Sequence, residues 1–492
     1  MMYDHEKSDS VIVAWNPANK AEQSVAEPEE RRTETKRNAD GCSTLRTQGR
    51  ECVSQALERV RQAARHRKKD KFTALLHHVN VDLMREAFFA LKRTAAPGVD
   101  GVTWADYETD LEPRLADLHD RVCRGAYRAQ PSRRRYIPKA DGRQRPLAMA
   151  ALEDKIVQKA VATVLGSIYE EEFLGFSHGF RPKRSQHDAL DALVVGITAR
   201  KVNFILDADI RSFFDTVSHE WLVRFVEHRI GDRRIIRLIQ KWLKAGVLED
   251  GIVTVNEAGT GQGSVISPLL SNIYLHYCFD LWADRWRRRE AKGDVIIVRY
   301  ADDTVVGFQH RDDAERFRDE MQQRLEKFAL SLHPDKTRLI EFGCYAAANR
   351  ARRGRGRPET FSFLGFVFIS GKTRAGKFLV HRKSRRDRMQ TKLHEIKNAL
   401  RERMHWSIPE QGKWLAQIVR GYFAYHAVPT NRRALSRFRH HVKSIWLRTL
   451  RRRSQRGVMT WDRIAKIADE WLPPARILHP WPRDRFAVRH SR

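Results

Sequence analysis

Two adjacent carboxylates, Asp302 and Asp303, stand between the apolar, β-branched stretches VIIVRY and TVVGF. Such stretches are typical of strands, so we expect the pair at the tip of a β-hairpin, at the rim of a core. Asp is a common turn residue, and a lone Asp-Asp in a turn usually has no other role. Here two like charges held beside a core repel each other unless a cation lies between them, which indicates a site for a divalent cation.

A second acidic stretch, ILDADIRSFFD, lies upstream. Asp209 ends a predicted strand over 202–209, Asp207 lies on the same face two residues back, and Asp215 belongs to the following turn. If this strand neighbours the hairpin, carboxylates from both meet at one sheet edge. There they could hold two Mg²⁺ ions, one activating an attacking hydroxyl and the other stabilising a leaving pyrophosphate. A nucleotidyl transferase needs this arrangement.

The charge of the chain indicates a polyanionic partner. The 492 residues include 92 Lys and Arg against 61 Asp and Glu, a formal net charge of +31. A nucleic acid is the leading partner for such a surface, and an anionic membrane is the alternative. The sequence has no uninterrupted apolar run of spanning length and starts with the polar MMYDHEKSDS, so we expect no membrane association and a cytoplasmic location.

The positions of the cysteines argue against a zinc site built from closely spaced cysteines. The five cysteines are scattered, with no close pair at the usual zinc-ligand spacing, and none lies beyond Cys344. We therefore expect free, reduced thiols and no C-terminal nuclease module built on a cysteine-ligated metal.

Helix and strand patterns alternate without an internal repeat, as in an α+β protein. We expect a helical, basic stretch from 51 to 78, a β-hairpin over 133–149, helices over 151–200, 219–246 and 312–330, and a strand over 361–368. The segment from Lys372 to Arg456 carries 24 Lys and Arg against 4 Asp and Glu, and lacks strand-like alternation. It is expected to form a separate, mainly helical, basic domain.

YADD inside a hairpin, together with LDADIRSFFD upstream, resembles the palm of reverse transcriptases. From about APGVDG to HPWP, the chain resembles the proteins encoded by bacterial group II introns. The blocks that carry this resemblance are YIPKADGRQRPL, SHGFRPKRSQHDAL, GTGQGSVISPLLSNIYLH, LHPDKTRLIEFG, FSFLGF and RGYFAYHAVPTN. Their number and order make chance resemblance very improbable.

The resemblance implies a right-hand polymerase fold, with fingers, a palm whose antiparallel sheet is backed by helices, and an α-helical thumb and maturase domain. The expected parts are a disordered polar segment at 1–50, fingers and palm at 51–345 with a helical extension at 51–95, a connection with the final palm strand at 346–371, a basic RNA-binding thumb at 372–480, and a basic tail at 481–492.

Matching positions imply the roles of single residues. Asp209 and Asp302 resemble the metal ligands, with Asp303 as a third carboxylate. Phe214 falls where the family places a bulky side chain against the sugar of the incoming nucleotide, although plain core packing is the alternative. A ring there collides with a 2′-hydroxyl and so favours deoxynucleotides.

Other matching residues are expected to bind the nucleotide. Lys139 and Arg145, on opposite arms of the hairpin, suit a triphosphate. Gln262 and Gly263 lie in a Gly-rich loop that lets backbone approach a nucleotide, and Lys336 would neutralise charge on the leaving phosphate. The chain departs from the family at Gly261, where a proline is usual, and at AMA after RPL, where Gly-Ile is usual.

The C-terminal region interleaves aromatic residues with cations, a composition that suits stacking on bases while binding phosphates. A solvated basic helical face is the alternative, and several of the aromatic residues are expected in the domain's own core. The candidate RNA-binding residues are Arg420, Tyr422, Tyr425, Arg432 and Arg433.

The resemblance implies an RNA-directed DNA polymerase that uses Mg²⁺ and deoxynucleoside triphosphates, extends a DNA primer or target DNA, and helps its own intron RNA to splice and move. In a bacterial cell such a protein would associate with the nucleoid when on DNA. Two alternatives stay open: a splicing-only RNA-binding maturase, and a free-standing reverse transcriptase with a defence role. The sequence also leaves open whether the protein forms a homodimer and how it primes synthesis.

Overall fold

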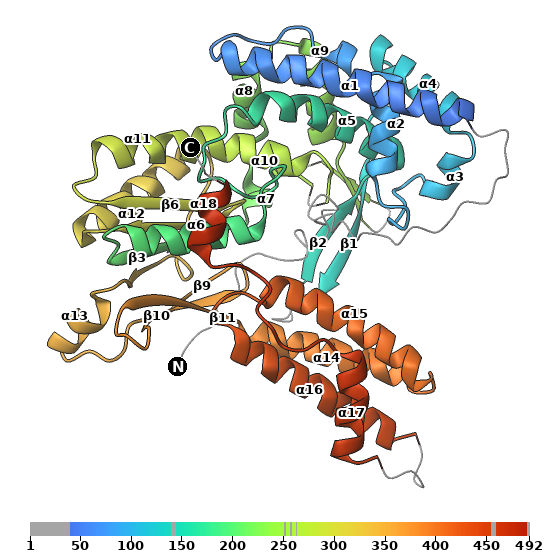
Figure 1. Ribbon diagram of the computed structural model, residues 1–492. Helices are drawn as coiled ribbons and strands as arrows, with labels where there is room; N and C mark the ends of the chain where they lie inside the picture. The colour runs from blue at the N-terminus through green and yellow to red at the C-terminus, as the bar shows by residue number, and fades with distance from the viewer. Residues whose placement is uncertain are drawn as a thin grey trace.

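The computed structural model describes residues 40–138, 144–249, 252–255, 258–261, 263–453 and 459–489. Its elements form three groups: N-terminal helices with a long hairpin, a central sheet flanked by helices, and a C-terminal helix bundle (Figure 1). The α+β class expected from the sequence is confirmed, because antiparallel sheets and many helices share one chain.

The N-terminal group is built from helices around a long hairpin. Its helices are α1 (Asp40–His66), a 3₁₀ turn (Leu76–His78), α2 (Val81–Ala90), α3 (Trp104–Glu108), α4 (Leu111–Arg124) and α5 (Leu152–Tyr169). Since α1 begins at Asp40, the prediction of a disordered segment over 1–50 is wrong for residues 40–50. The basic, helix-forming pattern noted from residue 51 starts earlier than we expected.

The predicted hairpin over 133–149 is confirmed as β1 (Ser132–Pro138) and β2 (Gln144–Met149), which pair antiparallel. Two strands that the sequence did not indicate, β4 (Val247–Glu249) and β5 (Ile252–Thr254), extend it into a sheet in the order β2-β1-β4-β5, here called the hairpin sheet. The predicted turn at Asp141 and Gly142 lies outside the described residues.

A second antiparallel sheet, here called the central sheet, has the order β6-β7-β3-β8. Its strands are β3 (Phe204–Ala208), β6 (Val295–Tyr300), β7 (Asp303–Phe308) and β8 (Arg338–Glu341). The helix α6 (Gln186–Ala199) precedes β3. The helices and helical turns between the strands are α7 (Phe213–Thr216), α8 (His219–Arg229), α9 (Arg233–Lys244), α10 (Ser267–Leu275), a π-helical turn (His276–Asp280), α11 (Leu281–Arg289) and α12 (Arg311–Glu326).

Both faces of the central sheet are covered. Leu206 packs into the core shared with Phe279 and Phe317, on the side of α10 to α12. Ile205 points the other way, into a core with Leu193 of α6 and Phe366 of a further sheet. Burial on both faces explains why VIIVRY and TVVGF are continuous apolar runs rather than alternating ones.

The predicted strand over 361–368 is two strands, β9 (Phe361–Phe363) and β10 (Phe366–Lys372), separated by Leu364 and Gly365, which have φ of 45° and 77°. With β11 (Phe378–Ser384) they form a separate three-stranded sheet after α13 (Ala346–Arg352). Two expectations are therefore wrong. The last strand of the central sheet is β8, and the region from 372 begins with the strand β11, which pairs with the preceding β10 and whose charged residues hid its alternation.

The C-terminal bundle consists of α14 (Arg386–Glu402), α15 (Ile408–His426), α16 (Arg432–Arg451) and α17 (Trp461–Trp471). Its own core includes Leu400, Val419, Phe438, Trp446 and Ile464, at least one from each helix. This confirms the helical character of most of the basic region. None of the helices in the described ranges is both long and apolar enough to span a membrane.

The last described residues return to the central sheet. The helix α18 (Pro482–Arg489) lies beside α6 in Figure 1. The buried Asp191 of α6 binds Arg485 of α18 at 3.2 Å and Arg382 of β11 at 2.7 Å. The described part of the segment expected to be a basic tail is therefore a docked helix, because Arg485 supplies a charge that the buried carboxylate needs.

Candidate active site

The two acidic segments meet at one edge of the central sheet. Antiparallel pairing of Ala208 with Thr304 places Asp209, the next residue after β3, beside Asp303, the first residue of β7. Tyr300 pairs with Asp303, so the hairpin turn consists of Ala301 and Asp302. This confirms the hairpin and the expected neighbourhood of the strands.

The carboxylates are more enclosed than hairpin-tip residues usually are. Asp209, Asp302 and Asp303 are 3%, 8% and 3% exposed. Asp303 lies within the strand rather than at the tip, and Asp207, 2% exposed, is buried further along β3. Desolvated like charges at one edge favour a bound cation.

A lysine from a third segment reaches this edge. Lys336 Nζ lies 3.2 Å from Asp209 Oδ2, and the backbone N–H of His333 donates to the Asp209 carbonyl at 2.8 Å. The HPDKT loop is thereby held against the end of β3. The structure thus places Lys336 beside a proposed metal ligand, where its charge can also act on a bound phosphate.

The donor chemistry of this edge fits Mg²⁺, which prefers carboxylate oxygens. In the part of the chain that the structure describes, no group of three or more His, Cys, Asp or Glu side chains is arranged to hold a metal ion by itself. Mg²⁺ is usually bound through one or two carboxylates together with waters and substrate phosphates, so a cage made only of protein groups is not required.

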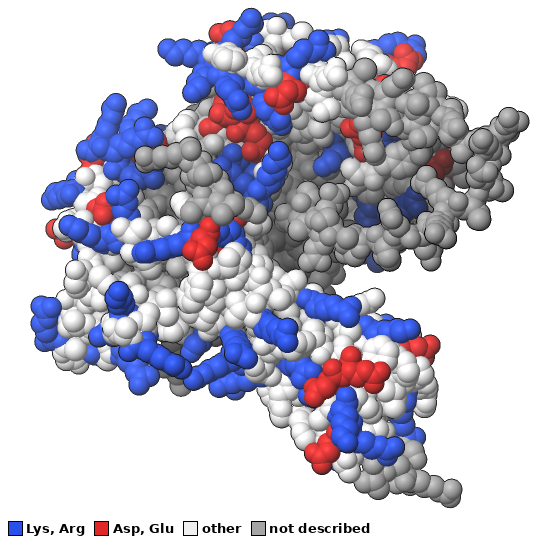
Figure 2. All heavy atoms as spheres, in the orientation of Figure 1, with Lys and Arg blue, Asp and Glu red and all other residues white. Residues whose placement is uncertain are grey.

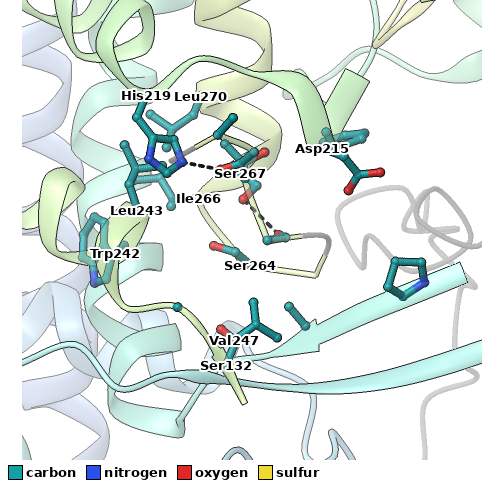
Figure 3. Close-up of a pocket in the computed structure, with 18 of the residues that line it drawn as sticks. Ser132, Asp215, His219, Trp242, Leu243, Val247, Ser264, Ile266, Ser267 and Leu270 are labelled. Carbon is teal, nitrogen blue, oxygen red and sulfur yellow. Dashed lines mark hydrogen bonds between the residues drawn. The ribbon is translucent and has the colours of Figure 1, made fainter. Parts of the chain in front are cut away.

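Phe214 lines a cavity of about 120 Å³ between the hairpin sheet and α7 to α10. Figure 3 shows this cavity with Ser132 and Val247 on one side and His219 and Leu270 on the other. Phe214 belongs to α7 and is 6% exposed. The N–H of Thr260 donates to the Phe214 carbonyl at 2.7 Å, which fixes the Gly-rich loop to α7. The cavity lining includes Arg134 and Ala148 from the hairpin, and Gly261 from the loop, but not the three carboxylates of the sheet edge.

The Gly-rich loop packs directly on β2. Gly263 has φ 112°, and a Cβ built there would lie 2.6 Å from the Ala148 carbonyl oxygen, so only glycine fits. A Cβ on Gly261 would lie 3.3 Å from the Ala148 Cβ. The two departures from the family, Gly261 and the AMA block, therefore face each other across this contact.

Three nucleotide-binding candidates remain: Lys139, Arg145 and Gln262. Lys139 and Gln262 lie outside the described residues. Arg145 belongs to β2, where its backbone pairs with Ile137. Their proposed roles stay predictions.

Two residues that support the loop were not identified from the sequence. Gln158 of α5 accepts hydrogen bonds through Oε1 from Ser264 Oγ at 2.9 Å and from the Val265 N–H at 3.1 Å. His219 Nε2 lies 2.6 Å from the Gly259 carbonyl oxygen (Figure 3). Neither residue belongs to a recognisable motif, so only the fold shows their contact with the loop.

The candidate RNA-binding residues divide into two kinds. Arg420, Arg432 and Arg433 are exposed. The Tyr422 ring stacks on Phe438 with 3.7 Å between centroids, and the Tyr425 hydroxyl donates to the Leu364 carbonyl at 2.7 Å. Both tyrosine rings are engaged in packing within the protein, so the arginines are the better candidates.

A central antiparallel sheet whose register brings Asp209 beside the Asp302–Asp303 hairpin, together with a separate hairpin sheet, is typical of nucleic-acid polymerases of the palm type. Residues 137–368 match the reverse transcriptase (RNA-dependent DNA polymerase) family. The chain belongs to the reverse transcriptase family.

Three relatives illustrate this similarity. The chain is 36% identical to protein YkfC of Escherichia coli K12 over 320 residues, which cover 59% of this chain and 80% of YkfC. It is 34% identical to the group II intron-encoded protein LtrA of Lactococcus lactis subsp. cremoris over 45% of this chain and 37% of LtrA. It is 42% identical to a 91 kDa protein in the cob intron of Schizosaccharomyces pombe over 40% of this chain and 24% of that protein. The alignments with the two intron proteins thus span well under half of their lengths.

Proposed function

We propose that this chain is the reverse transcriptase and maturase of a group II intron. It copies intron RNA into DNA and assists the splicing and mobility of that RNA. The observation that carries the proposal is the meeting of Asp209 with the Asp302–Asp303 hairpin at one sheet edge. The similarity to LtrA supports the connection to an intron.

In the proposed mechanism, Asp209, Asp302 and Asp303 would hold two Mg²⁺ ions. Once bound, these ions would supply activation of the primer 3′-hydroxyl and neutralisation of the leaving pyrophosphate. Lys336, 3.2 Å from Asp209, adds positive charge beside the triphosphate. Phe214 narrows the space for the sugar. Positioning and charge neutralisation are the main contributions of the protein.

The nucleotide enters, in this proposal, between the hairpin sheet and α7. Lys139 and Arg145 grip the triphosphate, and Gln262 and Gly263 contact the nucleotide or the template base. The contact of Gly263 with Ala148 supports this arrangement because it joins the loop to the hairpin. These assignments make the hairpin sheet part of the fingers and the central sheet the palm.

The C-terminal bundle is, in this proposal, the thumb and the RNA-binding maturase region. Figure 2 shows Lys and Arg side chains distributed over this lobe and the palm, with patches of Asp and Glu among them. Such a surface binds phosphates over a long stretch of RNA. We propose that Arg420, Arg432 and Arg433, all exposed, contact intron RNA.

Two alternatives make different predictions. A splicing-only maturase would bind intron RNA without making DNA, and a free-standing reverse transcriptase would make DNA without an intron around its coding sequence. The acidic edge with Lys336 beside it favours an active polymerase. The flanking DNA decides between intron and free-standing forms, since an intron protein lies within a folded ribozyme sequence.

The proposed function is tested with the purified wild-type protein, a homopolymer RNA template, a DNA primer, deoxynucleoside triphosphates and Mg²⁺. We expect primer extension that needs both the RNA and the metal. The intron RNA that flanks the coding sequence is then added, and we expect faster splicing in the presence of the protein. No extension with either Mg²⁺ or Mn²⁺ would exclude the polymerase, and extension without any effect on splicing would favour the free-standing form.

A further inference from the structure

Arg299, the first residue of the RYADD block, is fully buried, with 0% exposure, at the end of β6. A guanidinium has five N–H donors, and all five are used. Nε and Nη2 donate to the two carboxylate oxygens of Asp280 at 2.7 and 2.6 Å. Nη1 donates to Asn272 Oδ1 at 3.1 Å and to the Ala301 carbonyl at 2.9 Å, and Nη2 also donates to Ser177 Oγ at 2.7 Å.

These partners come from three separate segments. Asn272 on α10 and Asp280 at the end of the π-helical turn belong to one continuous helical stretch, Ser177 precedes α6, and Ala301 lies in the hairpin turn. Burial lowers the pKa of His276 to about 4, so this ring, 4.0 Å from Asp280, is neutral at physiological pH. The charge of Asp280 is therefore balanced by Arg299 and not by the histidine.

The hydrogen bond from Arg299 to the Ala301 carbonyl is the contact that affects the position of Asp302 and Asp303. Ala301 has φ 55°, a left-handed conformation that is unfavourable for a residue with a Cβ. Residues persist in this region when the surrounding structure fixes them. The guanidinium of Arg299 fixes the carbonyl of Ala301, and the next two residues are Asp302 and Asp303.

A second set of contacts holds the same turn from the other side. The Arg299 N–H donates to the Phe176 carbonyl at 2.9 Å, and the His178 N–H donates to the Arg299 carbonyl at 2.8 Å. A Cβ built on Gly179 would lie 2.3 Å from the Ala301 nitrogen, so the chain passes the turn at a distance that only glycine permits. Asn272 Nδ2 donates to the Gly179 carbonyl at 2.7 Å and joins the two sets.

We propose that Arg299 is a positioning residue for the catalytic carboxylates: through the carbonyl of Ala301 it holds the hairpin turn in the conformation that presents Asp302 and Asp303 to the metal. This role rests on the proposed polymerase function. Arg299 has no contact with solvent and so none with substrate. Its effect reaches the metal through the backbone of the turn.

A purely structural role is the competing explanation, since any buried ion pair that loses one partner destabilises a protein. Arg229 provides a matched control. It is 1% exposed, pairs with Glu172, and donates to the Arg67 carbonyl at 2.8 Å; its hydrogen-bond partners within the described ranges do not include the hairpin turn. Its loss should lower stability without altering the metal site.

The test compares Arg299→Lys, Ala301→Gly, the double variant, and Arg229→Lys. Mn²⁺ binding is measured by electron paramagnetic resonance, thermal unfolding by circular dichroism, and kcat and KM by primer extension. For Arg299→Lys we expect about tenfold weaker Mn²⁺ binding. We also expect kcat to fall by about 10- to 100-fold, with KM for deoxynucleotides changed by less than about threefold.

Glycine at 301 needs no support for a positive φ. The double variant should therefore recover roughly fivefold or more of the lost Mn²⁺ affinity and of kcat relative to Arg299→Lys. A positioning role requires this rescue, whereas a role confined to general stability would leave the metal affinity of the double variant no better than that of Arg299→Lys.

Arg229→Lys is expected to lower the unfolding temperature while Mn²⁺ binding stays within about twofold of wild type. Unchanged Mn²⁺ affinity in Arg299→Lys, an equal loss in Arg229→Lys, or no rescue by Ala301→Gly would each overturn the proposal. If Arg299→Lys does not fold, Asn272→Ala replaces it in the test, because this variant removes one acceptor of Nη1. Its Mn²⁺ affinity and kcat are expected to fall as well.

Failure of the polymerase function is distinguishable from failure of the positioning role. If the wild-type protein makes no DNA on an RNA template, the proposed polymerase function is wrong. If the wild-type protein is active but the Arg299→Lys variant binds Mn²⁺ normally, only the positioning role of Arg299 is wrong.

Discussion

The variant Asp302→Asn is expected to make DNA on an RNA template about a thousandfold more slowly than the wild-type protein, or not at all. The amide keeps the shape of the side chain but removes the negative charge that would hold Mg²⁺ beside the primer. Loss of metal-assisted charge stabilisation costs several kcal/mol, and about 4 kcal/mol corresponds to three orders of magnitude in rate. The measurement is single-turnover primer extension.

The fold of this variant should be intact. Asp302 is 8% exposed and neighbours Asp303, so removing one of two like charges should leave the unfolding temperature equal or slightly higher. Asp312→Asn, at an exposed position in the first turn of α12, is the matched control and should retain full activity. A fully active Asp302→Asn variant would show that this carboxylate does not take part in catalysis.

The second large effect is expected at Phe214, where Val should relax the choice between deoxynucleotides and ribonucleotides. Phe214 lines the cavity between α7 and the hairpin sheet, and Val replaces the ring with a shorter side chain that leaves space there. Steric discrimination of this kind is worth about 1 to 3 kcal/mol, so the relative efficiency of ribonucleotide incorporation should rise by about 10- to 100-fold. The measurement is kcat/KM for each nucleotide on the same primer and template.

Phe225→Val is the control for lost aromatic packing. Phe225 is also buried, but it lies on α8, packs against Tyr274 and Phe328, and is not among the described residues of the cavity lining. It should lower stability and leave sugar selection unchanged. If Phe214→Val and the wild-type protein discriminate equally between deoxynucleotides and ribonucleotides, Phe214 serves only in core packing.

The sequence predicted the features that depend on short local patterns of residues. The hairpin around Asp302 and the strand before Asp209 follow from short apolar runs that end in acidic residues. Their pairing in space could be expected only through the resemblance to reverse transcriptases, and the register of β3 with β7 confirms it. Composition likewise indicated the helical bundle.

The features that the sequence did not predict depend on contacts between distant segments. Ser177, Asn272 and Asp280 look ordinary in the sequence, and only the fold gathers them around Arg299. Tyr422 and Tyr425 suited RNA stacking by composition, but both pack internally. The strand β11 was missed because it includes the basic run HRK, in which Arg382 is buried and Lys383 exposed, and this run resembles the basic helices that follow.

The most direct test of the central claim, that β3 and the hairpin hold one metal site, is cleavage by bound iron. Fe²⁺ replaces Mg²⁺ in carboxylate sites, and with peroxide and ascorbate it generates hydroxyl radicals that cut the nearby backbone. We predict cuts in two separate segments, near Asp209 and near Asp302, that excess Mg²⁺ suppresses and that Asp302→Asn abolishes in both. Cuts in only one of the segments, or cuts in both that persist in Asp302→Asn, would contradict the account.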